Sequence, residues 1–136
     1  MVKTFALVVG VVYLLVGLMG FIPGLLSPPA GPDLAVDTLH GRLLGIFPVN
    51  IIHNVVHLAI GAWGIASYRT LGSAVGFARG LTVLYALLAV MGLIPGLNTM
   101  FGLVPLHGND VWLHAVTAAV AAYFGWGSDR SATTAR

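Results

Sequence analysis

Four long apolar stretches dominate the sequence, and each is about as long as a helix that crosses a bilayer. A helix needs about 20 apolar residues to span roughly 30 Å of hydrocarbon, and it satisfies its own backbone hydrogen bonds where lipid cannot. Only 7% of the residues are charged, whereas an ordinary soluble domain has about a quarter. We therefore expect an all-α integral membrane protein whose four spans cover residues 4–22, 48–67, 77–94 and 108–126.

The few charges are mostly basic and lie largely on one side of these spans. The chain has no cysteine, so disulfides, thiolate ligands and a haem attached through a C-x-x-C-H motif are excluded. The positive-inside rule places both termini in the cytoplasm, and this topology accounts for the basic balance without a nucleic-acid partner. The basic residues on the cytoplasmic side are Lys3, Arg69, Arg79, Arg130 and Arg136, and Arg42 lies opposite.

The chain contains two copies of one helical hairpin. The stretch FALVVGVVYLLVGLMGFIPGL aligns with FARGLTVLYALLAVMGLIPGL, which places Tyr13 on Tyr85. The second helices of the two copies also align, and this alignment places His57 on His114. Because each copy holds two spans, both copies enter the membrane in the same orientation, as parallel repeats around an axis along the membrane normal.

This duplication predicts one pseudo-symmetric four-helix bundle over residues 1–127. Repeat one covers residues 5–67 and repeat two covers residues 77–126. Residues 128–136 are polar or small and show no apolar periodicity, so we expect a flexible polar tail there.

A polar stripe recurs on the second helix of each copy, at positions i, i+3 and i+7. Ionisable groups inside a membrane nearly always face the bundle interior or a wet cavity, so we expect the two stripes to face each other. His57 and His114, called the deep histidines below, each lie about 14 Å past the proline at the start of their predicted helix, at 1.5 Å per residue. This distance predicts a position near mid-membrane. The stripes are Asn50, His53 and His57 in the first copy and His107, Asp110 and His114 in the second.

These residues could hold a cofactor between the second and fourth helices, in the outer half of the bilayer. A metal site of His53, His57, Asp110 and His114 offers three imidazoles and a carboxylate, which suits zinc, copper(II) or non-haem iron. Alternatively, His57 and His114 are the axial ligands of a b-type haem. In either case, Tyr13 and Tyr85 lie at the depth of the deep histidines and are their predicted hydrogen-bond partners. For the haem, the small residues expected to leave room for the macrocycle are Gly61, Gly64, Ala118 and Ala121.

Two further interpretations use the same stripes. The chain could be a non-catalytic accessory or scaffold subunit, bound to a larger membrane protein or to its own copies, in which the polar residues only fix helix packing at about 0.6 kcal/mol each. It could also line a proton or small-solute pathway. There is no G-x-S-x-G elbow, P-loop or dinucleotide fingerprint, so we do not expect an enzyme. The supporting polar residues are Asn50, Asn54, His107 and Asn109.

The motif N-x2-H-N-x2-H-L-x2-G from Asn50 to Gly61, with N-D-x2-L-H from Asn109 to His114, resembles a bacterial family of small four-span membrane proteins known as domain of unknown function 4383. The G-L-I-P-type ends of the first and third helices add to the resemblance, which extends from Phe5 to Trp126. It implies the fold and a location in the bacterial cytoplasmic membrane, but it implies no reaction. It also marks seven positions for testing: Asn50, His53, Asn54, His57, Asn109, Asp110 and His114.

Overall fold

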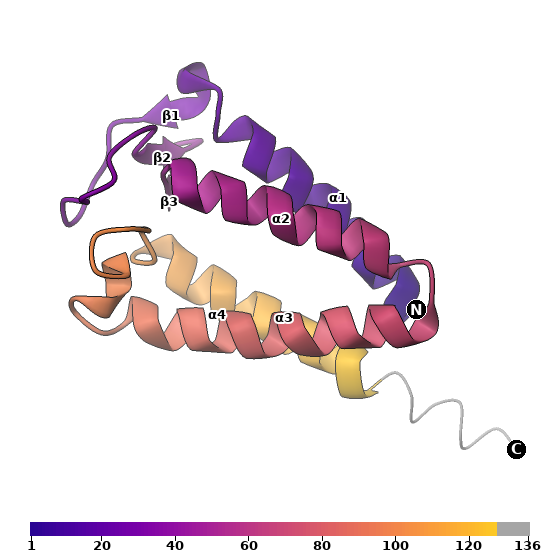
Figure 1. The fold of residues 1–136 in the computed structure, drawn as a ribbon. Coiled ribbons are helices and arrows are strands. Elements are labelled where there is room, and N and C mark those ends of the chain that lie inside the picture. Colours follow the sequence, from indigo (N-terminus) through magenta and orange to yellow (C-terminus); the bar gives the residue numbers. More distant parts are fainter. Residues whose placement is uncertain (128–136) are drawn as a thin grey trace, which may run out of the picture.

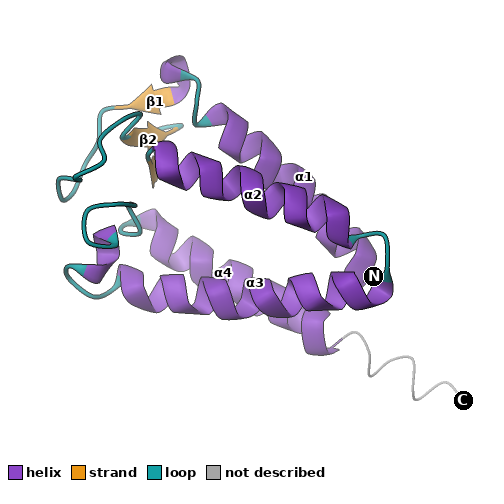
Figure 2. Cartoon of the chain, viewed as in Figure 1, coloured by secondary structure: helices purple, strands orange, loops and turns teal. Residues whose placement is uncertain are grey.

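The computed structural model describes residues 1–127, and these residues are mostly helical, which confirms the expected helical class (Figures 1 and 2). The expected flexible tail, residues 128–136, lies outside the described residues. A π-helical segment, Tyr123–Gly127, continues the last helix. The main helices are α1 (Val2–Met19), α2 (Ile51–Ser67), α3 (Leu71–Gly92) and α4 (Asn109–Ala122).

Side-chain caps set the starts of two helices and explain two differences from the predicted spans. The amide oxygen of Asn50 accepts a hydrogen bond from the His53 backbone N–H at 3.0 Å, so α2 begins three residues after the expected proline. The hydroxyl of Thr70 accepts from the Ser73 backbone N–H at 3.1 Å. Helix α3 therefore begins at Leu71, six residues before the predicted start.

The helices pack as two hairpins, α1 with α2 and α3 with α4. Glycines bring α1 and α2 into backbone contact, since a Cβ atom on Gly61 would lie 2.6 Å from the Leu14 backbone nitrogen. In Figure 1 the hairpins converge near the N-terminus and diverge towards the loops at the other end. At the converging end, Phe5 stacks on Phe124 with ring centroids 4.5 Å apart and also contacts the fully buried Phe77.

A small antiparallel sheet lies at the diverging end, where the sequence had suggested only loop. Its strands are β1 (Leu26–Ser27), β2 (Gly41–Leu43) and β3 (Phe47–Val49), in the order β1-β2-β3. Short 3-10 turns, Pro23–Leu25 and Leu97–Thr99, follow α1 and α3. The Ala35 N–H donates to the Gly102 carbonyl at 2.8 Å, which ties the long loop of the first hairpin to the loop of the second.

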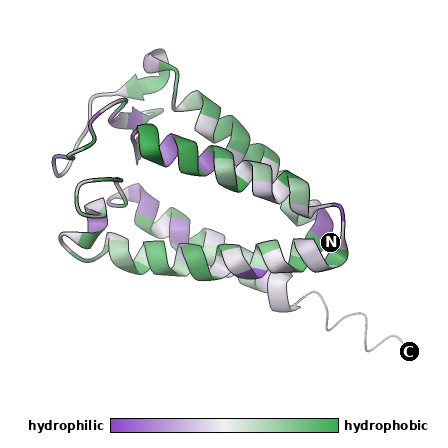
Figure 3. Cartoon of the chain, in the orientation of Figure 1, coloured by the Kyte–Doolittle hydropathy of each residue, from purple (hydrophilic) through white to green (hydrophobic). Residues whose placement is uncertain are grey.

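Helices α1 and α3 are long and apolar enough to cross a membrane, as judged by length and composition, and α2 is a shorter apolar helix. Most of the helical ribbon in Figure 3 is hydrophobic or near neutral, and hydrophilic residues are found near the loop ends of α2 and α4. The histidines, asparagines and aspartate of α2 and α4 thus lie towards the diverging end of the two hairpins, whereas Lys3 of α1 and Arg79 of α3 lie nearer the other end.

Candidate metal centre

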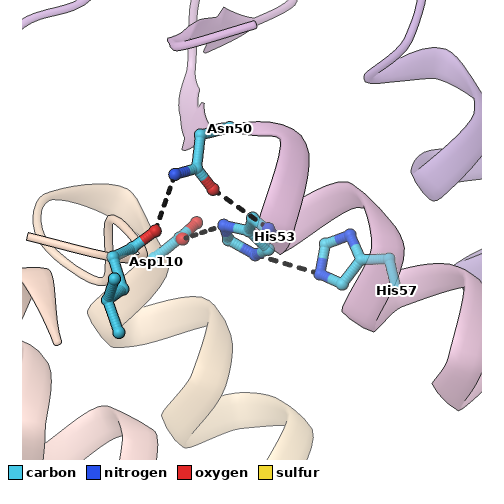
Figure 4. Close-up of polar contacts among 5 residues, drawn as sticks. Asn50, His53, His57 and Asp110 are labelled. Carbon is cyan, nitrogen blue, oxygen red and sulfur yellow. Dashed lines mark hydrogen bonds and ion pairs between the residues drawn. The ribbon is translucent and has the colours of Figure 1, made fainter. Parts of the chain in front are cut away.

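Three of the four residues predicted to bind a metal lie together where α2 and α4 begin. His53, Asp110 and His114 each offer one ligand atom, and these atoms all lie within 4.8 Å of one another. His53 Nδ1 is 3.8 Å from Asp110 Oδ2 (Figure 4). The side chains are deeply buried, with exposed fractions of 5%, 2% and 3%. The two polar stripes thus face each other through these three residues.

Each residue of this cluster has a buried side-chain atom without a hydrogen-bond partner among the described residues. These atoms are His53 Nδ1, Asp110 Oδ2 and His114 Nδ1. Burying a polar atom without a partner costs free energy, and such atoms are rare in folded proteins. Coordination of a cation would satisfy all three at once.

The donor set and its spacing fit a small divalent metal ion. Ligands at about 2.0–2.2 Å from a tetrahedral zinc ion lie about 3.4 Å from one another. The His53–Asp110 separation of 3.8 Å is slightly longer than this and the whole set lies within 4.8 Å, so side-chain rotations would have to bring the ligand atoms closer together. Two imidazoles and one carboxylate also occur in catalytic zinc sites, where a fourth position stays open to water or substrate.

His57, the fourth predicted ligand, lies beside the cluster rather than within the three-residue group. Its Nε2 atom is 3.1 Å from His53 Nε2, and the two rings are 70° apart. When His53 carries its proton on Nε2 and donates it to His57, its Nδ1 lone pair is directed at the cluster. Hydrogen-bond partners of this kind fix the tautomer and ring orientation of a ligating histidine. The geometry thus places His57 as a hydrogen-bond partner of His53.

The two predicted tyrosines form a symmetric row of aromatic rings with the deep histidines. Tyr13 meets His57 edge to face at 5.2 Å between centroids, and Tyr85 meets His114 in the same way at 5.1 Å. The tyrosines contact each other edge to face at 5.7 Å. Equivalent residues of the two repeats thus make equivalent contacts. These contacts between tyrosine and histidine are ring packing, whereas hydrogen bonds had been expected.

The predicted supporting asparagines bind backbone atoms instead of the cluster. The Asn50 amide donates to the carbonyls of Val36 and Leu103, at 2.9 and 2.7 Å. The Asn54 amide donates to the Gly20 carbonyl at 2.8 Å. These two side chains join segments far apart in the sequence and hold the diverging end together.

Asn109, the third supporting asparagine, has the same role at the surface. Its amide nitrogen donates to the Ile46 carbonyl at 3.2 Å, and its amide oxygen accepts from the Trp112 indole N–H at 3.1 Å. The bond to Ile46 attaches the start of α4 to the turn between β2 and β3, and the bond from Trp112 lies within α4.

His107 lies apart from the cluster, in the loop before α4. A Cβ atom on Gly31 would lie 2.5 Å from the His107 ring, so the long loop of the first hairpin packs directly on it. Burial lowers the pKa of His107 below its usual value of 6.5, and the neighbouring His40 lowers it further. This histidine pair belongs to the loops and does not join the metal centre.

The space expected for a haem is filled by protein. Gly61 lies against the α1 backbone, and a Cβ atom on Gly64 would be 2.8 Å from the Gly10 Cα atom. Ala118 and Ala121 lie in the hydrophobic core. These small residues bring helices together, so they do not provide the room that was expected of them for a macrocycle.

The cluster also lies closer to the helix ends than the sequence had suggested. His57 is six residues after the first residue of α2, about 9 Å at 1.5 Å per residue, instead of the 14 Å predicted from the proline. The difference arises because Pro48 belongs to β3. The backbone carbonyls of Pro48 and Pro105 lie near the His53 ring, a contact that the sequence did not predict.

These features define a helical protein with a buried histidine–aspartate cluster between two related hairpins. Residues 3–127 match the family model described as Domain of unknown function (DUF4383), and the chain belongs to this family. The family description assigns no activity. No curated protein and no solved structure matches the chain.

Proposed function

We propose that the chain is an integral membrane protein that binds one divalent transition-metal ion through His53, Asp110 and His114. The observation that carries the proposal is the convergence of ligand atoms from three buried residues on two helices, each of which has a buried side-chain atom without a hydrogen bond within residues 1–127. In an apolar environment such groups are costly unless they pair with each other or with a cation.

The exposed side chains of the helices support the membrane location. All four helices direct large apolar side chains outward, and a soluble protein rarely exposes apolar patches of this extent. In a bilayer the same side chains face lipid. We place the termini in the cytoplasm and the metal centre in the outer half of a bacterial cytoplasmic membrane. Representative exposed residues are Val8, Leu15, Val55, Val83, Leu87, Val116 and Val120.

The repeat supports one bundle of residues 1–127 around this centre. Repeat one, residues 5–67, contributes His53, and repeat two, residues 77–126, contributes Asp110 and His114. Zinc is the first candidate because two imidazoles and one carboxylate bind zinc without any thiolate ligand. Iron(II) and copper(II) accept the same donors.

Metal analysis of the purified protein tests the proposal. The protein is expressed with zinc, iron, copper or cobalt added, purified in mild detergent, washed with a weak chelator and analysed for bound metal. We expect about one ion per chain for the wild type and much less for His114→Ala. His40→Ala is the matched control, because it removes a buried histidine nitrogen outside the cluster and should retain the metal. A wild-type protein without bound metal would refute the proposal.

A scaffold role is the second candidate, favoured by the asparagine contacts. Asn50 and Asn54 use their amides to join backbone segments, as expected of residues that only fix packing. In this case His114→Ala would lower thermal stability without any change in metal content, and the wild type would co-purify with a larger membrane protein or with further copies of itself.

A further inference from the structure

A cavity of about 350 Å³ lies beside the metal centre. Ligand pockets in proteins typically measure about 300–1,000 Å³ and combine apolar walls with a few polar groups. Here the polar end consists of the cluster residues together with His57, Tyr13 and Tyr85. Apolar side chains of α1, β2, β3 and α4 form most of the remaining wall, among them Val12, Val16, Met19, Leu43, Phe47 and Leu113.

Side chains of both α1 and α4 line the cavity. These two helices pack chiefly on their hairpin partners, and the Phe5–Phe124 stack joins their ends away from the loops. Val12 lines the cavity yet is 47% exposed, so the cavity and the outer face of α1 are continuous there. On the loop side, Leu43 and Val49 are buried, whereas Leu44 lines the cavity and is 56% exposed. In a bilayer the exposed side of Val12 faces lipid.

The charge of the proposed centre specifies the head group of a ligand. A divalent ion bound by two neutral imidazoles and the Asp110 carboxylate keeps a net charge of +1. A net charge beside apolar walls is unfavourable unless an opposite charge compensates it. One monoanionic oxygen ligand in the open coordination position would neutralise the centre. The first turns of α2 and α4 also lie here, and helix N-termini favour anions.

We propose that the cavity takes an amphiphile from the bilayer, at the side where Val12 is exposed, and that its monoanionic oxygen head binds the metal. Carboxylate, phenolate and hydroxamate heads share this chemistry. The apolar body lies along Val12, Val16 and Leu113. This inference rests on the proposed metal site and adds the class of its ligand.

The experiment uses the full-length protein loaded with cobalt(II), whose visible absorption reports a change of ligands. Two hydroxamates serve as probes: acetohydroxamate, which has the head alone, and octanohydroxamate, which adds an apolar chain. We expect both to change the cobalt spectrum, with at least roughly tenfold tighter binding of octanohydroxamate because its chain is buried.

Two matched variants separate the cavity from partition into detergent micelles. Val16→Trp fills the cavity, whereas Leu15→Trp adds the same side chain to a 55% exposed position outside the cavity. We expect Val16→Trp to abolish the gain in affinity from the longer chain. Its affinity for acetohydroxamate should be unchanged, and this also shows that the variant is folded. We expect Leu15→Trp to retain the gain.

The outcomes distinguish this inference from the proposed function. Failure of the wild type to bind cobalt or any other metal overturns both. Bound cobalt whose spectrum does not respond to acetohydroxamate shows that no position is open and overturns the ligand inference alone. If octanohydroxamate binds more tightly than acetohydroxamate by the same factor in the wild type and in Val16→Trp, its chain lies in the micelle. This result would likewise overturn the cavity as the binding site.

Discussion

Replacing His57 by alanine separates the structural account of the metal centre from the four-ligand site that the sequence predicts. The structure makes His57 a hydrogen-bond partner of His53, at 3.1 Å between Nε2 atoms, and leaves three other residues to form the ligand group. In the variant, His53 loses the contact that fixes its ring, while both imidazole ligands and the carboxylate are kept.

The expected loss of metal affinity is intermediate. Removing the partner of a ligating histidine typically weakens metal binding about 10–100-fold, and this corresponds to roughly 1.4–2.7 kcal/mol. Removing a ligand itself, as in His114→Ala, should cost considerably more. His57→Gln keeps a side-chain acceptor near His53 Nε2 and should lie between His57→Ala and the wild type.

The assay is a competition titration of cobalt(II) against a chelator of known affinity, with the visible spectrum of bound cobalt recorded at saturation. For His57→Ala we expect weaker binding with the wild-type band shape, because the ligand set is unchanged. A loss as large as that of His114→Ala, with an altered spectrum, would show that His57 is a ligand. Unchanged affinity would show that the contact does not orient His53.

Three further predictions concern stability. Asn50→Ala should lower the free energy of unfolding by about 2–4 kcal/mol in a denaturant titration in detergent, because it removes a helix cap and leaves two carbonyls without their donor; a change below about 1 kcal/mol would contradict this. Gly61→Ala should lower the free energy of unfolding by about 1–3 kcal/mol through overpacking against α1, whereas Gly76→Ala, with open space around its Cβ, should be neutral or stabilising by up to about 1 kcal/mol; equal effects of the two would refute the close helix contact. Because the pKa of His107 is lowered in the folded protein, the unfolded chain binds a proton more readily and stability falls as the pH drops through about 6.5; His107→Gln should show a smaller fall in Tm than the wild type between about pH 7.5 and 5.5, and an identical fall would exclude this contribution.

The helices were predictable because their signals are local and repeated. Apolar stretches of sufficient length predict α1 and α3, and the duplicated hairpin predicts which helices pair. The pairing of His53 with Asp110 also followed from the repeat, because residues at the same level of two facing helices are neighbours. The helix starts were less predictable, since they depend on caps such as Asn50 and Thr70 within stretches rich in proline and glycine.

The division of the site into ligands and partners could not be read from the sequence. The spacing of His53 and His57 places both on one helical face, but it does not indicate which of them points at Asp110. The role of Gly61 was equally ambiguous, because a small residue can leave space for a cofactor or bring a helix closer, and here it contacts α1. In the sheet, β1 pairs with β2 across a long loop, for which local patterns give little signal, whereas β2 and β3 form a local hairpin.

X-ray absorption at the metal edge of the purified, metal-loaded protein tests the central claim most directly. The account predicts a first shell of nitrogen and oxygen ligands at about 2.0–2.2 Å, with the outer-shell scattering of two imidazole rings, and it predicts that His53→Ala removes one ring from that signal. A wild-type protein that carries no metal after loading, or a spectrum that is the same in the wild type and His53→Ala, would contradict it.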